Sequence, residues 1–316
     1  MALVETSERA TSLQSLLGAV QGEVRKAVVG YDKTIEFMLV AAVTGGHVLL
    51  EGPPGIAKTL LAGSMARALG VEFKRIQFTS DTQPDEITGT SRLRGPERVF
   101  EPGPVFTNVL LADEINRTPP RTQASLLEAM QERHVTVHGM TRWLPSPFMV
   151  IATQNPFELS GVFPLPESQL DRFLFKLELT YGSEEDELGV LSIPHRGLTP
   201  DMLEDIRPLL GPVEITRAQK ELDSTEVPEL VARAVVSIVR RTRDVPGVVL
   251  GCSPRSAVHL MTASKANAQL TGRSAVTIAD VLHMAPQVLP HRIVVDSSVT
   301  AAEVVASAAA AAELEA

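Results

Sequence analysis

Cysteine is nearly absent from this chain of 316 residues, in which Cys252 stands alone. One cysteine cannot form an intrachain disulfide, and this is consistent with a reducing compartment. No histidine or asparagine pattern accompanies it, so the sequence does not favour a catalytic thiol.

Long hydrophobic runs are also missing. The longest one near the start, residues 37–43, is too short to cross a bilayer. Residues 1–10 include Glu5, Glu8 and Arg9 and contain no apolar stretch like that of a signal peptide. We therefore expect a cytoplasmic protein without membrane insertion.

Aromatic residues are scarce, at 4%, so leucine, valine, isoleucine and alanine must fill most of the core. The content of 44% hydrophobic and 21% charged residues is typical of a globular protein, and the length allows one large or two modest domains. The net charge of −9 disfavours non-specific attraction to nucleic acid, which we do not expect as a partner.

Apolar strands alternate with helices over the first part of the chain. Helical spacing predicts helices over 13–28, from about 32 to 43, and over 59–69. Short apolar runs predict strands at 47–51, 109–112 and 148–152, and further strands are predicted at 71–78 and, from partial alternation, at 173–179. This alternation predicts an α/β fold, with a parallel sheet covered by helices on both faces.

The pattern changes after about residue 182. A helix is predicted over 183–191, a connector with proline and glycine over 194–212, and no convincing strand beyond it. Three helical stretches follow, at 226–243, 254–270 and 277–289, and the alanine-rich end at 301–316 is a helix-prone tail without a functional signal. A small helical domain is therefore expected after the α/β domain.

A glycine- and proline-rich loop lies between the strand at 47–51 and the helix at 59–69, which is the context that a phosphate-binding loop requires. Its backbone N–H groups and the helix N-terminus attract phosphate, Lys58 can reach the β- and γ-phosphates, and the Thr59 hydroxyl can bind Mg²⁺. Ala57 replaces the usual last glycine and fits there if φ is negative. A turn with a solvated lysine is the alternative. The predicted ATP-binding residues are Gly52, Pro53, Pro54, Gly55, Ile56, Ala57, Lys58, Thr59, Leu60 and Asp113.

Acidic and amide side chains follow the next two buried strands. Asp113 and Glu114 end the strand at 109–112, where an open α/β sheet binds its ligands. There Asp113 can hold magnesium through water, and Glu114 can orient and deprotonate the attacking water. Asn155 ends the following strand and is expected between the two sites, bound to that water or to the γ-phosphate. Alone, the acidic pair would be a solvated turn and Asn155-Pro156 a turn former.

Five strings together resemble the AAA+ superfamily, and specifically its MoxR family. They occur in the family's order, and the resemblance spans roughly residues 25–290. The strings are Gly52–Thr59, Leu110–Arg117 (LLADEINR), Ala152–Pro156 (ATQNP), Phe163–Lys176 (FPLPESQLDRFLFK) and Gly251–Arg255 (GCSPR). Residues 75–90 also look like the family's insertion in the second core helix.

The resemblance implies an αβα sandwich over 1–200, with the helix-2 insertion at about 78–106 and a hairpin at about 133–146. An all-α lid domain and the C-terminal tail would occupy 201–316. It also implies a hexameric ring that binds ATP and Mg²⁺ at each subunit interface. Family members usually act on protein clients, often with a partner that has a von Willebrand factor A domain.

The family's functional residues carry over to matching positions. Lys58 and Thr59 fall on the first nucleotide motif, Asp113 and Glu114 on the second, and Asn155 on sensor 1. Two arginines complete the set: Arg172 falls on the arginine finger and Arg255 on sensor 2. The resemblance thus implies catalytic Glu114, Asn155, Arg172 and Arg255, with Thr59 and Asp113 at the magnesium ion. The alternatives are a salt bridge of Arg172 with Asp171 or with another nearby acid, and a surface position for Arg255 at the start of a helix.

Other positions carry weaker signals. Tyr31 replaces the family's usual glutamine beside the expected adenine pocket, which leaves the base contacts open. His134 and His138 would stand about 13 Å apart along a strand, too far for a shared zinc ion. Trp143 is predicted to pack at the base of the hairpin, with exposure on the ring surface as the alternative. Four further histidines are isolated in the sequence and form no cluster, namely His195, His259, His283 and His291.

Three functions of different classes remain open. The first is an ATPase that remodels or matures a partner protein complex, with insertion of a metal cofactor as one form of that maturation. The second is a scaffold whose ring assembly depends on nucleotide, with incidental hydrolysis. The third is a DNA motor, which the acidic balance and the lack of a nucleic-acid-binding appendage disfavour.

Overall fold

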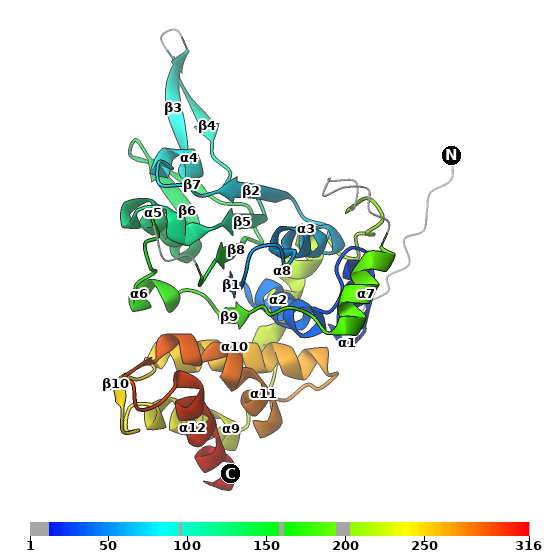
Figure 1. Cartoon of the computed structure of the whole chain (residues 1–316), viewed down its shortest axis with the longest axis vertical. Helices are drawn as coiled ribbons and strands as arrows, with labels where there is room; N and C mark the ends of the chain where they lie inside the picture. The colour runs from blue at the N-terminus through cyan, green and yellow to red at the C-terminus, as the bar shows by residue number, and fades with distance from the viewer. Residues whose placement is uncertain (1–12, 95–96, 158–160, 194–202, 316) are drawn as a thin grey trace.

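The computed structural model describes residues 13–94, 97–157, 161–193 and 203–315 (Figure 1). Residues 1–10, in which no signal peptide is expected, therefore lie outside the described residues, as do His195 and the part of the connector at 194–202. No helix in the described ranges is long and apolar enough to span a bilayer.

A parallel sheet of five strands forms the centre of the first domain. Its strand order is β2-β5-β8-β1-β9, and every neighbouring pair runs parallel. The strands are β1 (Val48–Glu51), β2 (Phe73–Gln77), β5 (Val109–Asp113), β8 (Met149–Gln154) and β9 (Phe175–Glu178). The five predicted strands and the αβα arrangement are confirmed.

The inner strands send alternate side chains into two cores, because successive side chains of a strand point to opposite faces. Val48 and Leu50 of β1 join one core, and Leu49 joins the other. The first core is built with α1 (Leu13–Val24), α2 (Asp32–Thr44) and α3 (Lys58–Ala68), and the second with α5 (Pro120–Glu132). Burial on both faces explains why β5 is apolar up to Asp113, whereas the two edge strands, β2 and β9, carry lysine.

Two hairpins extend from the sheet domain. The first follows α4 (Pro84–Thr88), consists of β3 (Gly89–Arg94) and β4 (Glu97–Pro102), and projects away from the body (Figure 1). The second joins β6 (His134–Val137) and β7 (Met140–Trp143), with a turn at His138 and Gly139, whose φ angles are 51° and 76°. Positive φ at both turn residues matches the right-handed twist of the paired strands.

The packing role predicted for Trp143 is wrong. Its side chain is 72% exposed, and its ring meets the His134 ring edge-to-face at 5.1 Å between centroids. The Trp143 side chain therefore lies on the solvent-exposed face of the hairpin.

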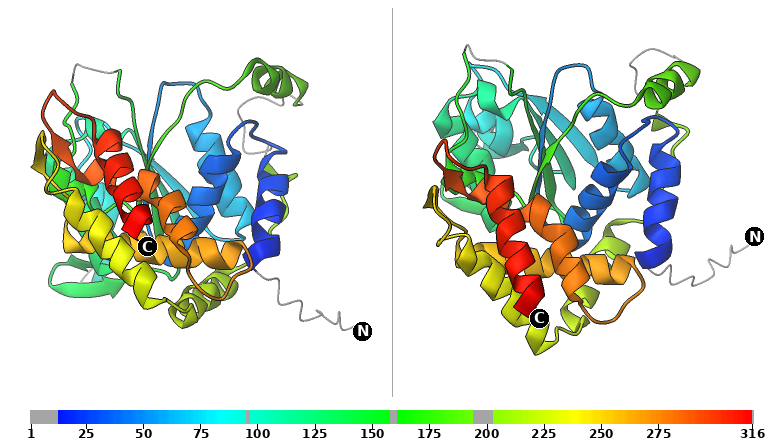
Figure 2. Two further views of the ribbon diagram at one scale, coloured as in Figure 1. Left: turned by 90° about the horizontal axis from the view of Figure 1, so that it is seen from below. Right: turned by 60° about the horizontal axis from the view of Figure 1, so that its bottom comes forward.

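Helices make up most of the second domain, as predicted. Figure 2 shows α9, α10, α11 and α12 gathered into one bundle beside the sheet domain. The elements from β9 onward are α7 (Glu184–Ser192), α8 (Pro212–Glu221), η3 (Leu222–Ser224), α9 (Glu229–Arg241), α10 (Pro254–Leu270), α11 (Ile278–Val288), η4 (Pro290–Arg292) and α12 (Ala301–Glu315).

One expectation for this domain needs correction. A short antiparallel pair, β10 (Val248–Leu250) with β11 (Val294–Val295), is present where no strand was expected. The tail is helical, as predicted, and α12 buries Val304, Val305 and two alanines in the core that it shares with α9 and α11. Small side chains let this helix approach its neighbours closely, so alanine here is core rather than surface.

Candidate nucleotide-binding site

The carboxyl ends of three neighbouring strands meet at one edge of the sheet. In the parallel register, Glu51 at the end of β1 lies opposite Gln154, and Gln77 lies opposite Asp113. β8 lies between β1 and β5 in the strand order. The loop after β1, Asp113 and Glu114 after β5, and Asn155 after β8 therefore share this edge.

The loop from Gly52 to Thr59 leaves room for a ligand at one glycine and closes tightly at another. Gly55 has a φ of 83°, and a Cβ added there would meet nothing within 4 Å. At Gly52, an added Cβ would lie 2.5 Å from the Leu179 carbonyl oxygen. Gly52 is thus required by packing and Gly55 by its backbone conformation.

Ala57 departs from the sequence expectation. Its φ is 61° and its ψ is 25°, so the residue is left-handed, whereas the sequence analysis required a negative φ. The left-handed region brings Cβ close to the following carbonyl oxygen and costs roughly 1–2 kcal/mol for a residue other than glycine. The loop retains the conformation that glycine would adopt and carries this strain.

The Lys58 ammonium lies across the loop. Its Nζ donates to the carbonyl oxygen of Gly52 at 2.6 Å and to that of Gln154 at 3.3 Å. Burial lowers the pKa of Lys58 from its ordinary value, and the charges of Asp113, Glu114 and Glu51 oppose that shift. The lysine therefore holds a partly desolvated positive charge at the mouth of the loop.

Thr59 and Asp113 fit the requirements of a magnesium ion. The Thr59 hydroxyl donates to Asp113 Oδ2 at 3.3 Å, so the two oxygens lie side by side and would be able to hold a magnesium ion, Asp113 through a water molecule. Both are hard oxygen donors, and Asp113 is 7% exposed. Two partners of Asp113 were missed in the sequence. Thr153 donates to its Oδ1 at 2.6 Å, and Arg75 pairs with its Oδ2 at 2.7 Å.

Glu114 is held at the same edge by three contacts. Its carboxylate accepts from Gln77 Nε2 at 2.6 Å and pairs with Arg117 Nε at 2.9 Å. Its backbone N–H donates to the Thr153 hydroxyl at 2.8 Å. With a φ of 58°, the residue itself is left-handed, which turns the chain sharply after β5. The strain is typical of functional turns.

Asn155 is partly exposed at the end of β8. Its Oδ1 accepts from the Phe157 backbone N–H at 3.1 Å, which is the local turn that an asparagine before proline forms. The side-chain amide remains on the same edge as the phosphate loop.

A cavity of about 880 Å³ adjoins the phosphate loop. It is bounded by residues 27–31, by Gly55–Ala57 and Leu60, and by the segment from Glu178 to Asp186 with the following helix α7. Burial, and then the Asp186 charge, raise the pKa of the Tyr31 phenol that lines it. Tyr31 and Leu60 thus stand beside the loop, where a base attached to the bound phosphates would reach.

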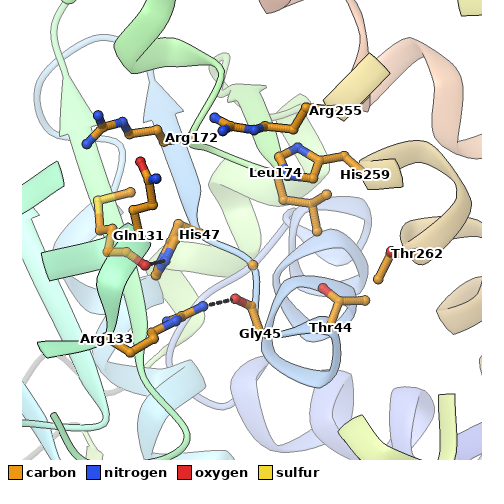
Figure 3. Close-up of a pocket in the computed structure, with 12 residues that line it drawn as sticks. Thr44, Gly45, His47, Gln131, Arg133, Arg172, Leu174, Arg255, His259 and Thr262 are labelled. Carbon is orange, nitrogen blue, oxygen red and sulfur yellow. Dashed lines mark hydrogen bonds between the residues drawn. The ribbon is translucent and has the colours of Figure 1, made fainter. Parts of the chain in front are cut away.

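Arg172 and Arg255 come together elsewhere. Both line a second cavity, of about 320 Å³, with Gly46 and His47 at the amino end of β1 (Figure 3). Six residues of extended chain, about 20 Å, separate this end from Gly52. Figure 3 shows the Arg255 side chain extending from the lid toward Arg172.

Asp171 does not form the salt bridge with Arg172 that the sequence left open as an alternative. Its carboxylate instead accepts Arg292 Nε at 2.9 Å, and Arg255 Nη1 lies 3.6 Å from it. The Arg255 side chain is 52% exposed, so it is only partly solvated. Its place in the first turn of α10 and its exposure also fit the alternative of a surface arginine at a helix start.

Two of the histidines described as isolated lie close to one another. His259 Nδ1 accepts from Arg292, and His291 Nε2 donates to the Phe173 carbonyl oxygen at 3.1 Å. Burial and the charges of Arg292 and Arg255 lower the pKa of His259 to about 3. Within the described ranges, no three metal-binding side chains gather at one point.

Comparison with known proteins agrees with this geometry. A model of the ATPase family associated with various cellular activities (AAA) matches residues 47–175, and a model of the AAA lid domain matches residues 240–312. A crystal structure of a candidate ATPase from Cytophaga hutchinsonii superimposes with a TM-score of 0.85, at 33% identity over 94% of both chains. The fold and the site therefore define an AAA+ ATPase.

Named relatives narrow the class. The chain is 44% identical to Chaperone MoxR1 of Mycobacterium tuberculosis, over 89% of this chain and 76% of that protein. It is 30% identical to Protein MoxR of Methylorubrum extorquens, over 86% and 85% of the two chains. It is also 43% identical to the uncharacterized protein YeaC of Bacillus subtilis, over 89% and 88%. The chain belongs to the MoxR family of AAA+ ATPases.

Proposed function

We propose that this chain binds Mg·ATP at the 52–59 loop, hydrolyses it in a hexameric ring of identical subunits, and uses the hydrolysis to remodel or mature a protein client. The observation that carries the proposal is the meeting of Lys58, Thr59, Asp113 and Glu114 at one sheet edge, beside a cavity large enough for a nucleoside.

Each residue at the edge has a chemical task in this proposal. The Lys58 charge and the backbone N–H groups of the loop bind the phosphates. Glu114 accepts a proton from the attacking water, and the Asn155 amide orients that water. Thr59 and Asp113 hold the magnesium ion, which neutralises charge on the transferred phosphate. Leu60 and Tyr31 contact the base.

The positions of the two arginines support a ring. Arg172 and Arg255 lie together at the amino edge of the sheet, about 20 Å of extended chain from the loop of their own subunit. A guanidinium in that position serves the nucleotide of a neighbouring subunit, where it stabilises charge on the departing phosphate. In this arrangement Arg255, like Arg172, acts on the neighbour.

The identity of the client rests on kinship. One relative bears the name Chaperone MoxR1, which supports a protein client over DNA. The family suggests a partner with a von Willebrand factor A domain, insertion of a metal cofactor as one possible outcome, and a cytoplasmic location. The exposed Trp143 and Leu93, on the two hairpins, offer apolar contacts for such a partner.

Two variants test the proposal. Arg172→Ala should lower ATP turnover by a factor of about 10³ or more, the usual contribution of an arginine finger, while Mg·ATP affinity stays near that of the parent. Turnover per subunit should also rise with protein concentration, because each site needs a neighbour. Parental turnover in Arg172→Ala, or turnover independent of concentration, would defeat the shared site.

The client is sought with Glu114→Gln bound to ATP. This variant should retain a partner protein that the parent releases, since it binds nucleotide without hydrolysing it. A partner complex that matures normally with Glu114→Gln would favour a nucleotide-dependent scaffold. A shift of duplex or single-stranded DNA at low salt would favour a DNA motor.

A further inference from the structure

A buried arginine of the lid binds the short segment that carries Arg172. Arg292, at the end of η4, is 5% exposed. Its Nε donates to the Asp171 carboxylate at 2.9 Å, and its Nη2 donates to the Phe173 carbonyl oxygen at 2.6 Å. These two partners are the residues immediately before and after Arg172.

The same guanidinium is tied into the lid. Arg292 Nη1 donates to the Val288 carbonyl oxygen, at the end of α11, and Nη2 approaches His259 Nδ1 on α10. A third contact reaches the sheet domain, from Nη1 to the Leu174 carbonyl oxygen at 3.4 Å. A planar guanidinium with five donors can serve all these acceptors at once, which an ammonium cannot.

Burial makes these contacts obligatory. Burial lowers the pKa of Arg292 to about 10, while the Asp171 charge raises it, so the guanidinium stays charged at neutral pH. A buried charge is tolerated only when it is paired and hydrogen-bonded. A shift of the lid must therefore carry the segment around Arg172 with it or break these bonds.

Asp171 connects Arg292, which anchors this segment to the lid, with the two arginines of the second cavity, Arg172 and Arg255. Its carboxylate receives Arg292 on one oxygen and lies near Arg255 on the other. Arg172 follows it directly in sequence, and the Arg172 side chain has no ion pair among the described residues. The segment thus presents a free guanidinium from a backbone that is fixed on both sides.

We propose that Arg292 is a positioning residue for Arg172, through which the lid of one subunit sets the rate of hydrolysis in the neighbouring subunit. This inference rests on the proposed function, in which Arg172 serves the neighbour's nucleotide. Displacement of a charged group by about 1 Å can cost a factor of about 100 in rate, so loss of the anchor has a large expected effect.

The experiment mixes two inactive variants. Arg292→Gln retains its phosphate loop and loses the anchor of its finger, whereas Lys58→Ala loses phosphate binding and retains its finger. Arg292→Gln alone should turn over ATP about 100-fold more slowly than the parent, with Mg·ATP affinity within about threefold. An equal mixture with Lys58→Ala should recover at least about tenfold over Arg292→Gln alone, because Lys58→Ala subunits present intact fingers to intact loops.

A matched control separates positioning from loss of lid stability. Arg273 forms an ion pair with the buried Asp280, at 2.5 Å, and its side-chain partners all belong to the lid. Arg273→Gln should therefore keep the parental turnover even where it lowers the melting temperature as much as Arg292→Gln does. If Arg292→Gln does not fold, Arg292→Lys takes its place, since lysine can reach Asp171 but cannot serve both flanking residues.

The outcomes separate the two proposals. A second equal mixture pairs Arg172→Ala with Lys58→Ala. Recovery in this mixture, but none in the mixture of Arg292→Gln or Arg292→Lys with Lys58→Ala, would overturn the positioning role and leave the shared site intact. No recovery in either mixture, with ring mass unchanged by light scattering, would overturn the shared site and the positioning role together. Equal recovery in both mixtures is the expected result.

Discussion

Arg75 and Thr59 approach the same carboxylate oxygen of Asp113. Arg75 Nη2 lies 2.7 Å from Asp113 Oδ2, and Thr59 Oγ1 lies 3.3 Å from it. An arginine and a magnesium ion would compete for this oxygen, because both bind through its negative charge. The pair therefore sets how much magnesium the site requires.

Replacing Arg75 by alanine should lower the magnesium concentration that gives half-maximal turnover. The Arg75 side chain is 47% exposed, and a pair of this kind contributes about 0.2–1 kcal/mol, so the shift should reach at most about fivefold. Arg92→Ala, which breaks a pair with Glu101 on the first hairpin, is the control and should leave the requirement unchanged. A higher magnesium requirement in Arg75→Ala would mean that the arginine assists the ion.

Glycine at position 57 should stabilise the protein. The left-handed backbone of Ala57 costs roughly 1–2 kcal/mol, which glycine would avoid. Glycine also gives the unfolded chain more conformational entropy, and this offsets about 0.4–1 kcal/mol of the stabilisation. We expect the free energy of unfolding of Ala57→Gly to rise by about 0.5–1 kcal/mol in urea denaturation. Ala232→Gly, within α9, should instead lower it by about 1 kcal/mol. Equal losses in the two variants would contradict the strain at Ala57.

Acid should destabilise the protein through its buried histidines. The pKa of His259 falls to about 3 in the fold, from an ordinary value of 6.5, so the unfolded chain binds one more proton between these values. Its contribution to stability is complete above about pH 6.5 and is lost as the pH falls toward 3. At pH 5 the loss should be about 2 kcal/mol.

Denaturation of His259→Asn at pH 7 and pH 5 checks this expectation. Asparagine keeps an acceptor for Arg292 but does not titrate, so the difference in stability between the two pH values should shrink by about 2 kcal/mol. His47 and His291, whose pKa values burial also lowers, would supply the slope that remains. The exposed His138 is the control position. If the free energy of unfolding of His259→Asn depends on pH as strongly as that of the parent, His259 is not buried in its neutral form.

Trp143 should contribute little to folding stability. Since its side chain is 72% exposed, we expect Trp143→Ala to change the free energy of unfolding by less than about 1 kcal/mol by circular dichroism in urea. Phe148→Ala, at a site that is 4% exposed, should cost about 3–5 kcal/mol. A loss above about 2 kcal/mol in Trp143→Ala would show that the ring packs against the body. As the one tryptophan of the chain, it also reports on the hairpin by fluorescence.

Local patterns in the sequence predict the sheet and its carboxyl edge. Apolar runs identify the inner strands and partial alternation identifies β9, and a residue at the end of a strand needs no knowledge of distant neighbours to be placed there. For this reason Asp113 and the phosphate loop could be recognised together. No local pattern shows which face of a hairpin packs against the body. For this reason Trp143 was predicted to pack, although its side chain is exposed.

Contacts between distant segments lie beyond sequence patterns. Arg75 and Thr153 reach Asp113 from the two flanking strands, and this depends on the strand order. Arg292 meets Asp171 across 121 positions, a pairing that no spacing rule contains. The left-handed Ala57 was missed because its side chain gives no indication of φ.

Turnover and nucleotide affinity of Glu114→Gln, measured side by side, test the central claim most directly. The substitution keeps the shape of the side chain and removes the proton acceptor. We expect Mg·ATP to bind within about threefold of the parental affinity and turnover to fall by a factor of about 10²–10⁴. Turnover at the parental rate with unchanged affinity would contradict the assignment of this sheet edge as the site of ATP hydrolysis.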